Sequence, residues 1–157
     1  MAIDEFTNTG VMRNVFTSSP DKSLGYLLTR VYGLRQKKMN EELAPLGLNY
    51  VQYNLLAGLY WLQMNGETVN QMTLINFTKL DKSVVSSILR KFTNDAYVSR
   101  VEGTEDTRAK IVTLTAKGKG LTEKAIKIIN YIDEKFWGDT SQEPVLQFLC
   151  NVINVNT

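Results

Sequence analysis

The chain of 157 residues contains no histidine and a single cysteine, Cys150. Histidine is the usual general base near neutral pH, so its absence removes the commonest route to acid–base catalysis. A zinc site would need several cysteine or histidine ligands, and the chain offers only one. The sequence also has no phosphate-binding glycine loop and no nucleophile elbow. We therefore expect a protein that is not an enzyme and that holds no cofactor or metal.

Long apolar runs are also missing from the sequence. No stretch approaches the roughly 20 apolar residues of a membrane span, and the N-terminus lacks the basic and apolar regions of a secretion signal. A lone cysteine cannot form an internal disulfide, which fits a reducing compartment. We expect a cytoplasmic protein with no membrane partner. The neighbours of Cys150 include Leu149, Val152 and Ile153, which favours a buried interface role over that of a redox sensor.

The net charge is only +2, but it is unevenly distributed along the chain. Residues 79–120 carry nine Lys or Arg and five Asp or Glu, whereas residues 1–78 are balanced and residues 121–157 are net negative. A local positive excess is the footprint expected of a surface that binds nucleic acid. Because the excess is small, we expect a dimer, which would double it.

The residues after Leu80 predict an amphipathic helix. Asp81 is a good N-cap, because its carboxylate can accept a hydrogen bond from a free amide of the first turn. Four apolar residues then follow with the spacing of one helix face: Val85, Ile88, Leu89 and Phe92. The other face carries small hydroxyls and cations, which can approach base edges and phosphates. The alternative is an ordinary surface helix with a solvated polar face.

A polar hairpin is expected directly after this helix. Residues 98–101 and 111–115 are rich in β-branched side chains, as strands tend to be. The segment between them is too polar for a core and carries Arg108 and Lys110, which suit phosphate or minor-groove contacts. Asp106 could hold the Arg108 guanidinium in position. The alternative is an exposed turn with incidental charges. A helix followed by such a hairpin is typical of a winged helix-turn-helix.

Several short motifs follow one another along nearly the whole chain. They are Leu24-Gly25-Tyr26-Leu27-Leu28, Gly47-Leu48-x-x-x-Gln52-Tyr53, Leu80-Asp81-Lys82-Ser83 with Val85-Ser86, Asp106-x-Arg108-Ala109-Lys110, and Val112-x-Leu114-Thr115-x-x-Gly118. By their order and spacing, residues 23–155 resemble the multiple-antibiotic-resistance regulator (MarR) family of bacterial transcription factors. The resemblance implies a homodimer in which N- and C-terminal helices intertwine, and a DNA-binding lobe between them.

The chain departs from the family pattern at positions that bear on DNA binding. The family usually has Arg where Ser87 and Thr107 stand, so two DNA contacts are lost. Gly commonly ends the recognition helix where Ala96 stands. A left-handed conformation at Ala96 would cost on the order of 1 kcal/mol. Asn94 or Asp95 could take that role instead.

The remaining sequence predicts helices with recognisable start signals. Ser19-Pro20 opens the first, Asn49 and Gln52 form a capping box for the next, and Thr115 caps a long helix. Residues 71–78 form the first helix of the helix-turn-helix. The expected fold is mostly α with a small β-hairpin wing. We expect one domain, with residues 49–115 as the winged lobe and residues 1–48 and 116–157 as the dimerisation helices. The apolar residues Phe6, Val11, Met12 and Phe16 suggest that residues 1–18 dock on the partner subunit.

The predicted function is that of a homodimeric transcriptional regulator, most often a repressor in this family. It would bind a pseudo-palindromic DNA duplex with half-sites about 10 bp apart or a multiple of that. The base-facing candidates are Ser83, Ser86, Ser87 and Arg90, and the backbone or minor-groove candidates are Lys82, Lys91, Arg108 and Lys110. The alternative is a small-molecule-binding or protein-binding dimer that keeps the fold but has lost specific DNA binding.

Family members often bind small aromatic or phenolic acids between the dimerisation helices and the DNA-binding lobe. Aromatic side chains with one arginine would suit such an effector. The candidates are Tyr26, Arg30, Tyr53 and Tyr60, with Trp61 beside them. The alternative is that these rings belong to the core and the subunit interface, where aromatic residues are common.

Overall fold

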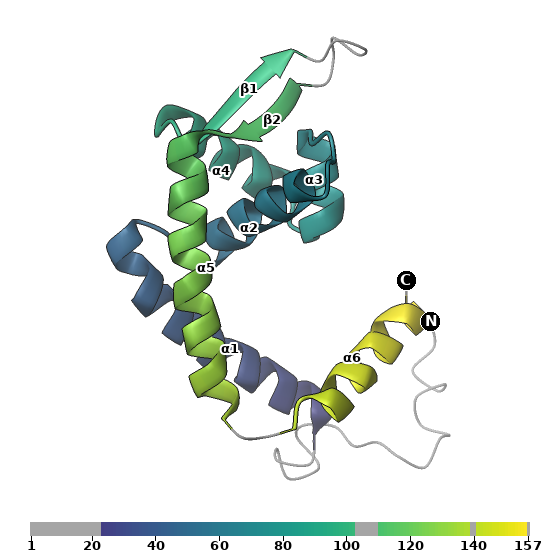
Figure 1. The fold of residues 1–157 in the computed structure, drawn as a ribbon. Helices are drawn as coiled ribbons and strands as arrows, with labels where there is room; N and C mark the ends of the chain where they lie inside the picture. Colours follow the sequence, from purple (N-terminus) through teal and green to yellow (C-terminus); the bar gives the residue numbers. More distant parts are fainter. Residues whose placement is uncertain (1–22, 103–109, 139–140, 157) are drawn as a thin grey trace. The chain divides into compact units, whose positions relative to one another are not determined.

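The computed structural model describes residues 23–102, 110–138 and 141–156. The chain divides into two compact units, residues 1–38 and residues 39–157. Figure 1 shows the elements of the fold. The described residues are mostly α-helical and include one two-stranded hairpin. The expected fold class is therefore confirmed. Within the described ranges, no helix has both the length and the apolar character needed to cross a membrane.

The first unit contains most of helix α1 (Leu24–Leu43). Its apolar side chains are exposed over several successive turns, namely Leu24, Leu27, Leu28, Val31, Tyr32 and Leu34. The buried residues of α1, Met39 and Leu43, both belong to the second unit. The start signal at Ser19-Pro20 and the apolar residues proposed to dock before it lie outside the described residues.

Helix α2 (Tyr50–Met64) begins at the capping box that the sequence predicts. Asn49 Oδ1 accepts from the Gln52 amide at 2.9 Å, and Gln52 Oε1 accepts from the Asn49 amide at 3.1 Å. A short 3-10 helix, η3 (Ala44–Leu46), precedes it and ends at Gly47, whose φ of 70° is left-handed. These local signals separate α1 from α2 at the expected place.

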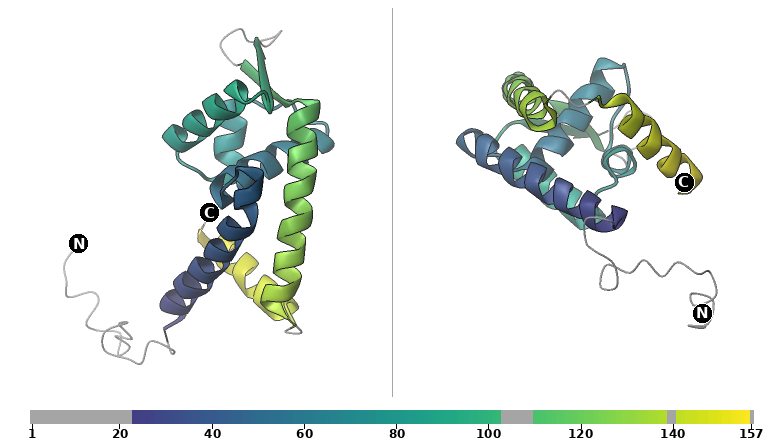
Figure 2. Two further views of the ribbon diagram at one scale, coloured as in Figure 1. Left: turned by 90° about the vertical axis from the view of Figure 1, so that its left-hand side faces the viewer. Right: turned by 90° about the horizontal axis from the view of Figure 1, so that it is seen from below.

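Three further helices and the hairpin follow α2 in the second unit. They are α3 (Gln71–Thr78), α4 (Lys82–Asn94), β1 (Val98–Glu102), β2 (Lys110–Leu114) and α5 (Ala116–Trp137). The strands are antiparallel, and Val98 pairs with Leu114 at the base of the hairpin. In Figure 1 and the left view of Figure 2, the hairpin lies at the end of the lobe where α5 begins. Residues 71–78 form the predicted first helix of the motif.

One hydrophobic core joins the winged lobe of residues 49–115 to α5. It contains Leu55 and Leu59 from α2, Leu74 from α3, Val112 from β2 and Ile132 from α5, together with the apolar face of α4. All four apolar residues predicted for that face are buried, and Phe92 is 0% exposed. Burial of such a side chain contributes roughly 1.5–3 kcal/mol, so packing holds α4 in one orientation.

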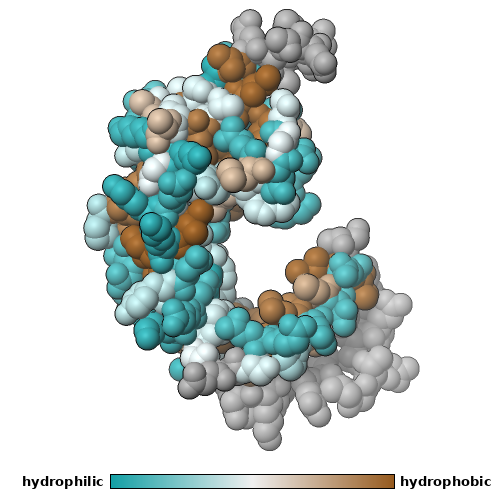
Figure 3. All heavy atoms as spheres, viewed as in Figure 1, coloured by the Kyte–Doolittle hydropathy of each residue, from teal (hydrophilic) through white to brown (hydrophobic). Residues whose placement is uncertain are grey.

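Helix α6 (Glu143–Asn156) differs from the others because it has no buried residue. Its exposed apolar side chains are Val145, Leu146, Phe148, Val152, Ile153 and Val155. Several hydrophobic residues of the chain are visible at the surface in Figure 3. Cys150 on this helix is also exposed. It is therefore not buried within a single copy of the chain.

Candidate nucleic-acid interface

The polar face of α4 is presented to solvent. Lys82, Ser83, Ser87, Arg90 and Lys91 are exposed, and Ser86 is half-buried. Asp81 takes the extended N-cap conformation, but its side chain makes no capping hydrogen bond, so that part of the prediction is wrong. The carboxylate is exposed, and water can satisfy it instead. The predicted base-facing residues thus share one accessible helix surface.

The turn between α3 and α4 is held by a backbone conformation that the sequence did not predict. Lys79 adopts a left-handed conformation with φ of 56°, and its amide donates to Ile75 O at 2.9 Å. Thr78 Oγ1 donates to Leu74 O at 2.7 Å and accepts from the Leu80 amide at 3.4 Å. These bonds close α3 and set the direction in which α4 begins.

The end of α4 is fixed by Ala96, whose φ of 59° is left-handed. The Ala96 amide donates to Thr93 O at 3.1 Å, and the Tyr97 amide donates to Phe92 O at 2.8 Å. This confirms the conformation considered for Ala96 at the usual glycine position. Asn94 remains helical and Asp95 has φ of −80°, so the alternative role for either residue is wrong.

The hairpin is anchored to α3 as well as to α5. Its two strands are joined by a hydrogen bond between the Ser99 and Thr113 hydroxyls at 2.7 Å. The Val112 amide donates to Val69 O at 2.8 Å, just before α3, and the Thr115 amide donates to Tyr97 O at 3.0 Å. Lys110 at the start of β2 is exposed. Arg108, with its neighbours Asp106 and Thr107, lies outside the described residues.

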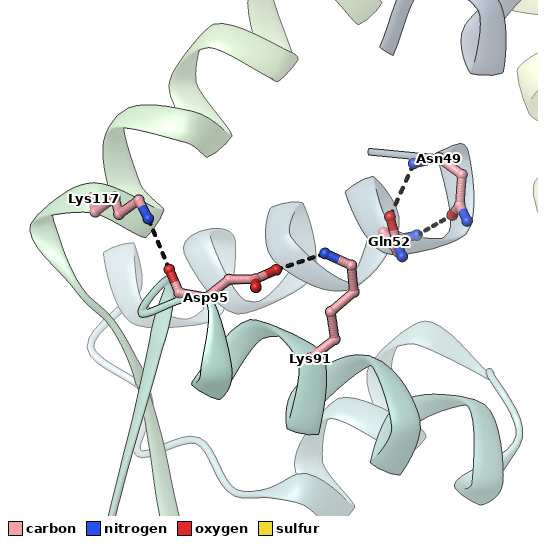
Figure 4. A network of polar contacts seen from close by, with 5 residues as sticks. All are labelled: Asn49, Gln52, Lys91, Asp95 and Lys117. Carbon is pink, nitrogen blue, oxygen red and sulfur yellow. Dashed lines mark hydrogen bonds and ion pairs between the residues drawn. The ribbon is translucent and has the colours of Figure 1, made fainter. Parts of the chain in front are cut away.

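Figure 4 shows a polar network at the C-terminal end of α4. Lys91 Nζ forms an ion pair with Asp95 Oδ2 at 2.6 Å, and Lys117 Nζ donates to the Asp95 backbone oxygen at 2.9 Å. Lys117 also lies over the Tyr97 ring, 4.6 Å from its centroid. An exposed ion pair contributes about 0–1 kcal/mol. Lys91 can therefore leave Asp95 at little energetic cost, but its charge is partly neutralised where it stands.

Two surface pockets adjoin α4. One, of about 340 Å³, lies between α4 and the start of α2 and is lined by Asn49, Val51, Gln52, Ser83, Val84, Ser87 and Ile88. The other, of about 390 Å³, is lined by Asn70, Gln71, Met72, Ile75, Lys82, Arg100, Lys110 and Val112. Four predicted DNA-contact residues therefore line these pockets. Ser83 and Ser87 line the first, and Lys82 and Lys110 line the second. Arg100 was not identified from the sequence, although an arginine within the strand that follows α4 was a usable signal.

The four predicted effector residues are divided between the two units. Tyr26 and Arg30 belong to the first unit, and Tyr53 and Tyr60 belong to the second. Tyr53 stacks on Tyr50 with ring centroids 6.1 Å apart, and Trp61 stacks on Phe77 at 5.3 Å. A single effector site that contains these residues stays a prediction.

Tyr60 has a polar partner on another helix. Its hydroxyl donates to Glu123 Oε1 on α5 at 3.2 Å. Desolvation, followed by the hydrogen bond and the negative charge of Glu123, raises the pKa of Tyr60 above its ordinary value. Tyr60 therefore links α2 to α5 as a neutral phenol.

A short helix, a tight turn, an amphipathic second helix and a paired hairpin define a winged helix-turn-helix protein. Residues 45–131 match the family model described as the ArnR1-like winged-helix domain. The uncharacterized HTH-type transcriptional regulator YdcH of Bacillus subtilis is 30% identical over 120 residues, which are 76% of this chain and 82% of YdcH.

Two solved structures have the same fold. CouR from Rhodococcus jostii RHA1, bound to p-coumaroyl-CoA, matches with a TM-score of 0.76 and 22% identity, covering 88% of this chain and 95% of CouR. A mutant of E. coli MarR complexed with operator DNA matches with a TM-score of 0.71 and 19% identity, covering 84% and 92% of the two chains. The family model and YdcH show that the chain belongs to the winged helix-turn-helix transcriptional regulators, and its fold is that of the MarR structures.

Proposed function

We propose that the protein is a homodimeric repressor that binds a pseudo-palindromic operator through α4 and the hairpin. The observation that carries this proposal is the division of α4 into a fully buried apolar face and an exposed polar face. Packing fixes the helix, so its serines and Arg90 form a rigid surface of the size that enters a major groove. Repression is the commonest role in this family.

The exposed apolar residues of α1 and α6 support the dimer. Both helices expose apolar side chains on successive turns, and contiguous apolar patches of this kind mark interaction surfaces. We assign residues 1–48 and 116–157 to dimerisation and residues 49–115 to DNA binding, within one MarR-like domain. A second copy would cover these faces, and Cys150 would then lie in or near the interface. The compartment would be the cytoplasm, where the operator is.

A small aromatic or phenolic effector would release the operator. Tyr26, Arg30, Tyr53 and Tyr60 remain the proposed contacts, because an arginine beside aromatic rings suits an aromatic carboxylate. The p-coumaroyl-CoA bound to CouR contains a phenolic group of this chemical class.

Two residues on the exposed face of α4 favour a second function. Ser87 is exposed where the family usually has Arg, and Lys91 is paired with Asp95. Both features reduce the positive charge available to DNA. The chain would then be a small-molecule-binding or protein-binding dimer that has lost specific DNA binding.

Selection from a library of genomic fragments separates the two functions. The repressor proposal predicts enrichment of one palindromic site, with half-sites spaced by about 10 bp or a multiple of it. Enrichment should be lost when Ser83 and Arg90, two of the proposed base-facing residues, are both replaced by Ala. The fold of this variant should persist because both side chains are exposed. The absence of any enriched site with the parent protein would support the second function.

A further inference from the structure

The pocket between α3, α4 and the hairpin combines cations from three elements. Lys82 lies in the first turn of α4, Arg100 in β1 and Lys110 at the start of β2. Its other described lining residues are neutral. Because like charges repel one another at short range, three cations around one cavity favour an anionic occupant.

Arg100 has hydrogen-bonding capacity that the described residues do not satisfy. Its Nη2 donates to Gln71 Oε1 at 3.4 Å, a long bond, and its Nε is buried with no hydrogen-bond partner among the described residues. An unsatisfied buried donor is unfavourable, and a guanidinium presents its donors as a fork that matches an oxyanion. The oxygen atoms of an anion in the pocket would accept hydrogen bonds from the guanidinium group and hold the Arg100 side chain in place.

The start of α3 adds a second source of positive potential to the pocket. The amides of Gln71 and Met72 are in the first turn, where helical amides have no acceptor within the helix. The cap does not serve them, because Asn70 Oδ1 accepts from the Thr73 amide at 2.9 Å and Asn70 O accepts from the Leu74 amide at 3.1 Å. Free amides at a helix N-terminus favour phosphate and similar anions.

We propose that this pocket binds one phosphodiester group of the DNA backbone in each half-site. Arg100 is its principal ligand, Lys82 and Lys110 contribute charge, and Gln71 is a positioning residue for Arg100. The inference rests on the proposed DNA-binding function and adds a defined phosphate contact to it. The pocket lies between the two elements that would read DNA, so a phosphate held there fixes the register of α4 without reading sequence.

The first test measures the binding of a selected palindromic duplex by fluorescence anisotropy at several salt concentrations. Arg100→Gln should weaken binding about 10- to 100-fold, as expected for a hydrogen bond to a charged group. It should also reduce the slope of log affinity against log salt by about 0.9 per protomer, the value for one phosphate. Arg100→Lys should restore the slope but not the full affinity, because an ammonium group lacks the fork.

Lys127→Gln is the matched control. Lys127 is an exposed cation on α5 and is absent from the pocket lining, so its replacement removes the same charge elsewhere. It should change neither the affinity nor the slope. Thermal unfolding of each variant shows whether Arg100→Gln still folds, and Gln71→Ala should give a smaller loss of affinity in the same direction.

The second test places one neutral methylphosphonate linkage at each position of the duplex in turn. If Arg100 binds one phosphodiester, one position in each half-site weakens the parent protein but does not weaken Arg100→Gln further. Inorganic phosphate is titrated into the free protein in parallel. Phosphate binding that is lost in Arg100→Gln, with no methylphosphonate position dependent on Arg100, would assign the pocket to a free anion and overturn the proposal.

The remaining outcomes separate this inference from the proposed function. A parent protein that binds no duplex overturns both. A parent that binds with a steep salt dependence, while Arg100→Gln behaves like Lys127→Gln, overturns only the phosphate site. An affinity loss in Arg100→Gln that leaves every methylphosphonate position as sensitive as in the parent also overturns it, because Arg100 would then act only through folding.

Discussion

Gly118, in the first turn of α5, leaves no room for a side chain. A Cβ at this position would lie 1.9 Å from the Tyr97 carbonyl oxygen and 2.8 Å from its carbonyl carbon. Both are backbone atoms, and the same oxygen accepts the Thr115 amide at 3.0 Å. Relief of the clash would therefore move α5 away from β1 and break the contact that anchors the hairpin. We predict that Gly118→Ala destabilises the winged-helix lobe.

Three terms set the size of this effect. Overpacking of a well-packed site costs about 1–3 kcal/mol. Displacement of α5 also weakens the cap in which Thr115 Oγ1 accepts from the Gly118 amide at 3.0 Å, a contact of the kind that contributes about 1 kcal/mol. The replacement of a helical glycine by alanine returns about 1 kcal/mol. The expected net loss in free energy of unfolding is about 1–3 kcal/mol, dominated by the overpacking.

Gly120→Ala is the control for this prediction. It lies in the same helix, but a Cβ added there meets no atom within 4 Å. The control should stabilise the protein by about 0.5–1 kcal/mol through helix propensity alone. Urea denaturation followed by circular dichroism, at one protein concentration because a dimer's stability depends on it, compares the two. If both variants stabilise the protein, the close approach of α5 to Tyr97 is wrong.

Three further predictions concern the turn after α4, the reading surface and the contact between α2 and α5. Ala96→Gly should raise the free energy of unfolding by about 0.5–1 kcal/mol, because φ of 59° is unfavourable for alanine; an unchanged urea midpoint would contradict this. Arg90→Ala should weaken operator binding by about 1–3 kcal/mol and relax preference at one position per half-site if Arg90 contacts a base. A selected sequence identical to the parent's would assign the readout to the serines. Tyr60 has a folded pKa above its unfolded value of 10.0, so its stabilising effect is present below that pH and is lost as pH rises through the folded pKa. The parent should therefore lose more stability above pH 10 than Tyr60→Phe, and equal losses in pH-dependent urea titrations would refute this.

Local sequence signals were sufficient for most of the winged lobe. The spacing of Val85, Ile88, Leu89 and Phe92 predicted the buried face of α4, because the helical period is fixed by backbone geometry. The capping box at Asn49 was also predictable, since both of its hydrogen bonds form between residues three apart. Features of this kind depend on neighbours in the sequence and are therefore visible without a structure.

Other features depend on packing between distant segments. The left-handed conformation of Lys79 carries no sequence signal of its own, because lysine does not favour it and the packing of α3 against α4 imposes it. The pocket around Arg100 unites residues from α3, α4 and both strands, and no spacing in the sequence brings them together. The effector residues were chosen from their chemistry alone, and Tyr26 and Tyr53 lie in different units of the chain.

The central claim is that a dimer of this protein binds duplex DNA through a cationic surface at α4 and the hairpin. Its most direct test is the affinity of the parent protein for duplex DNA as a function of salt concentration. If the dimer neutralises about 6–10 phosphates, affinity should fall about 10³- to 10⁵-fold between 50 and 200 mM salt. An affinity that stays nearly constant over this range would contradict the claim.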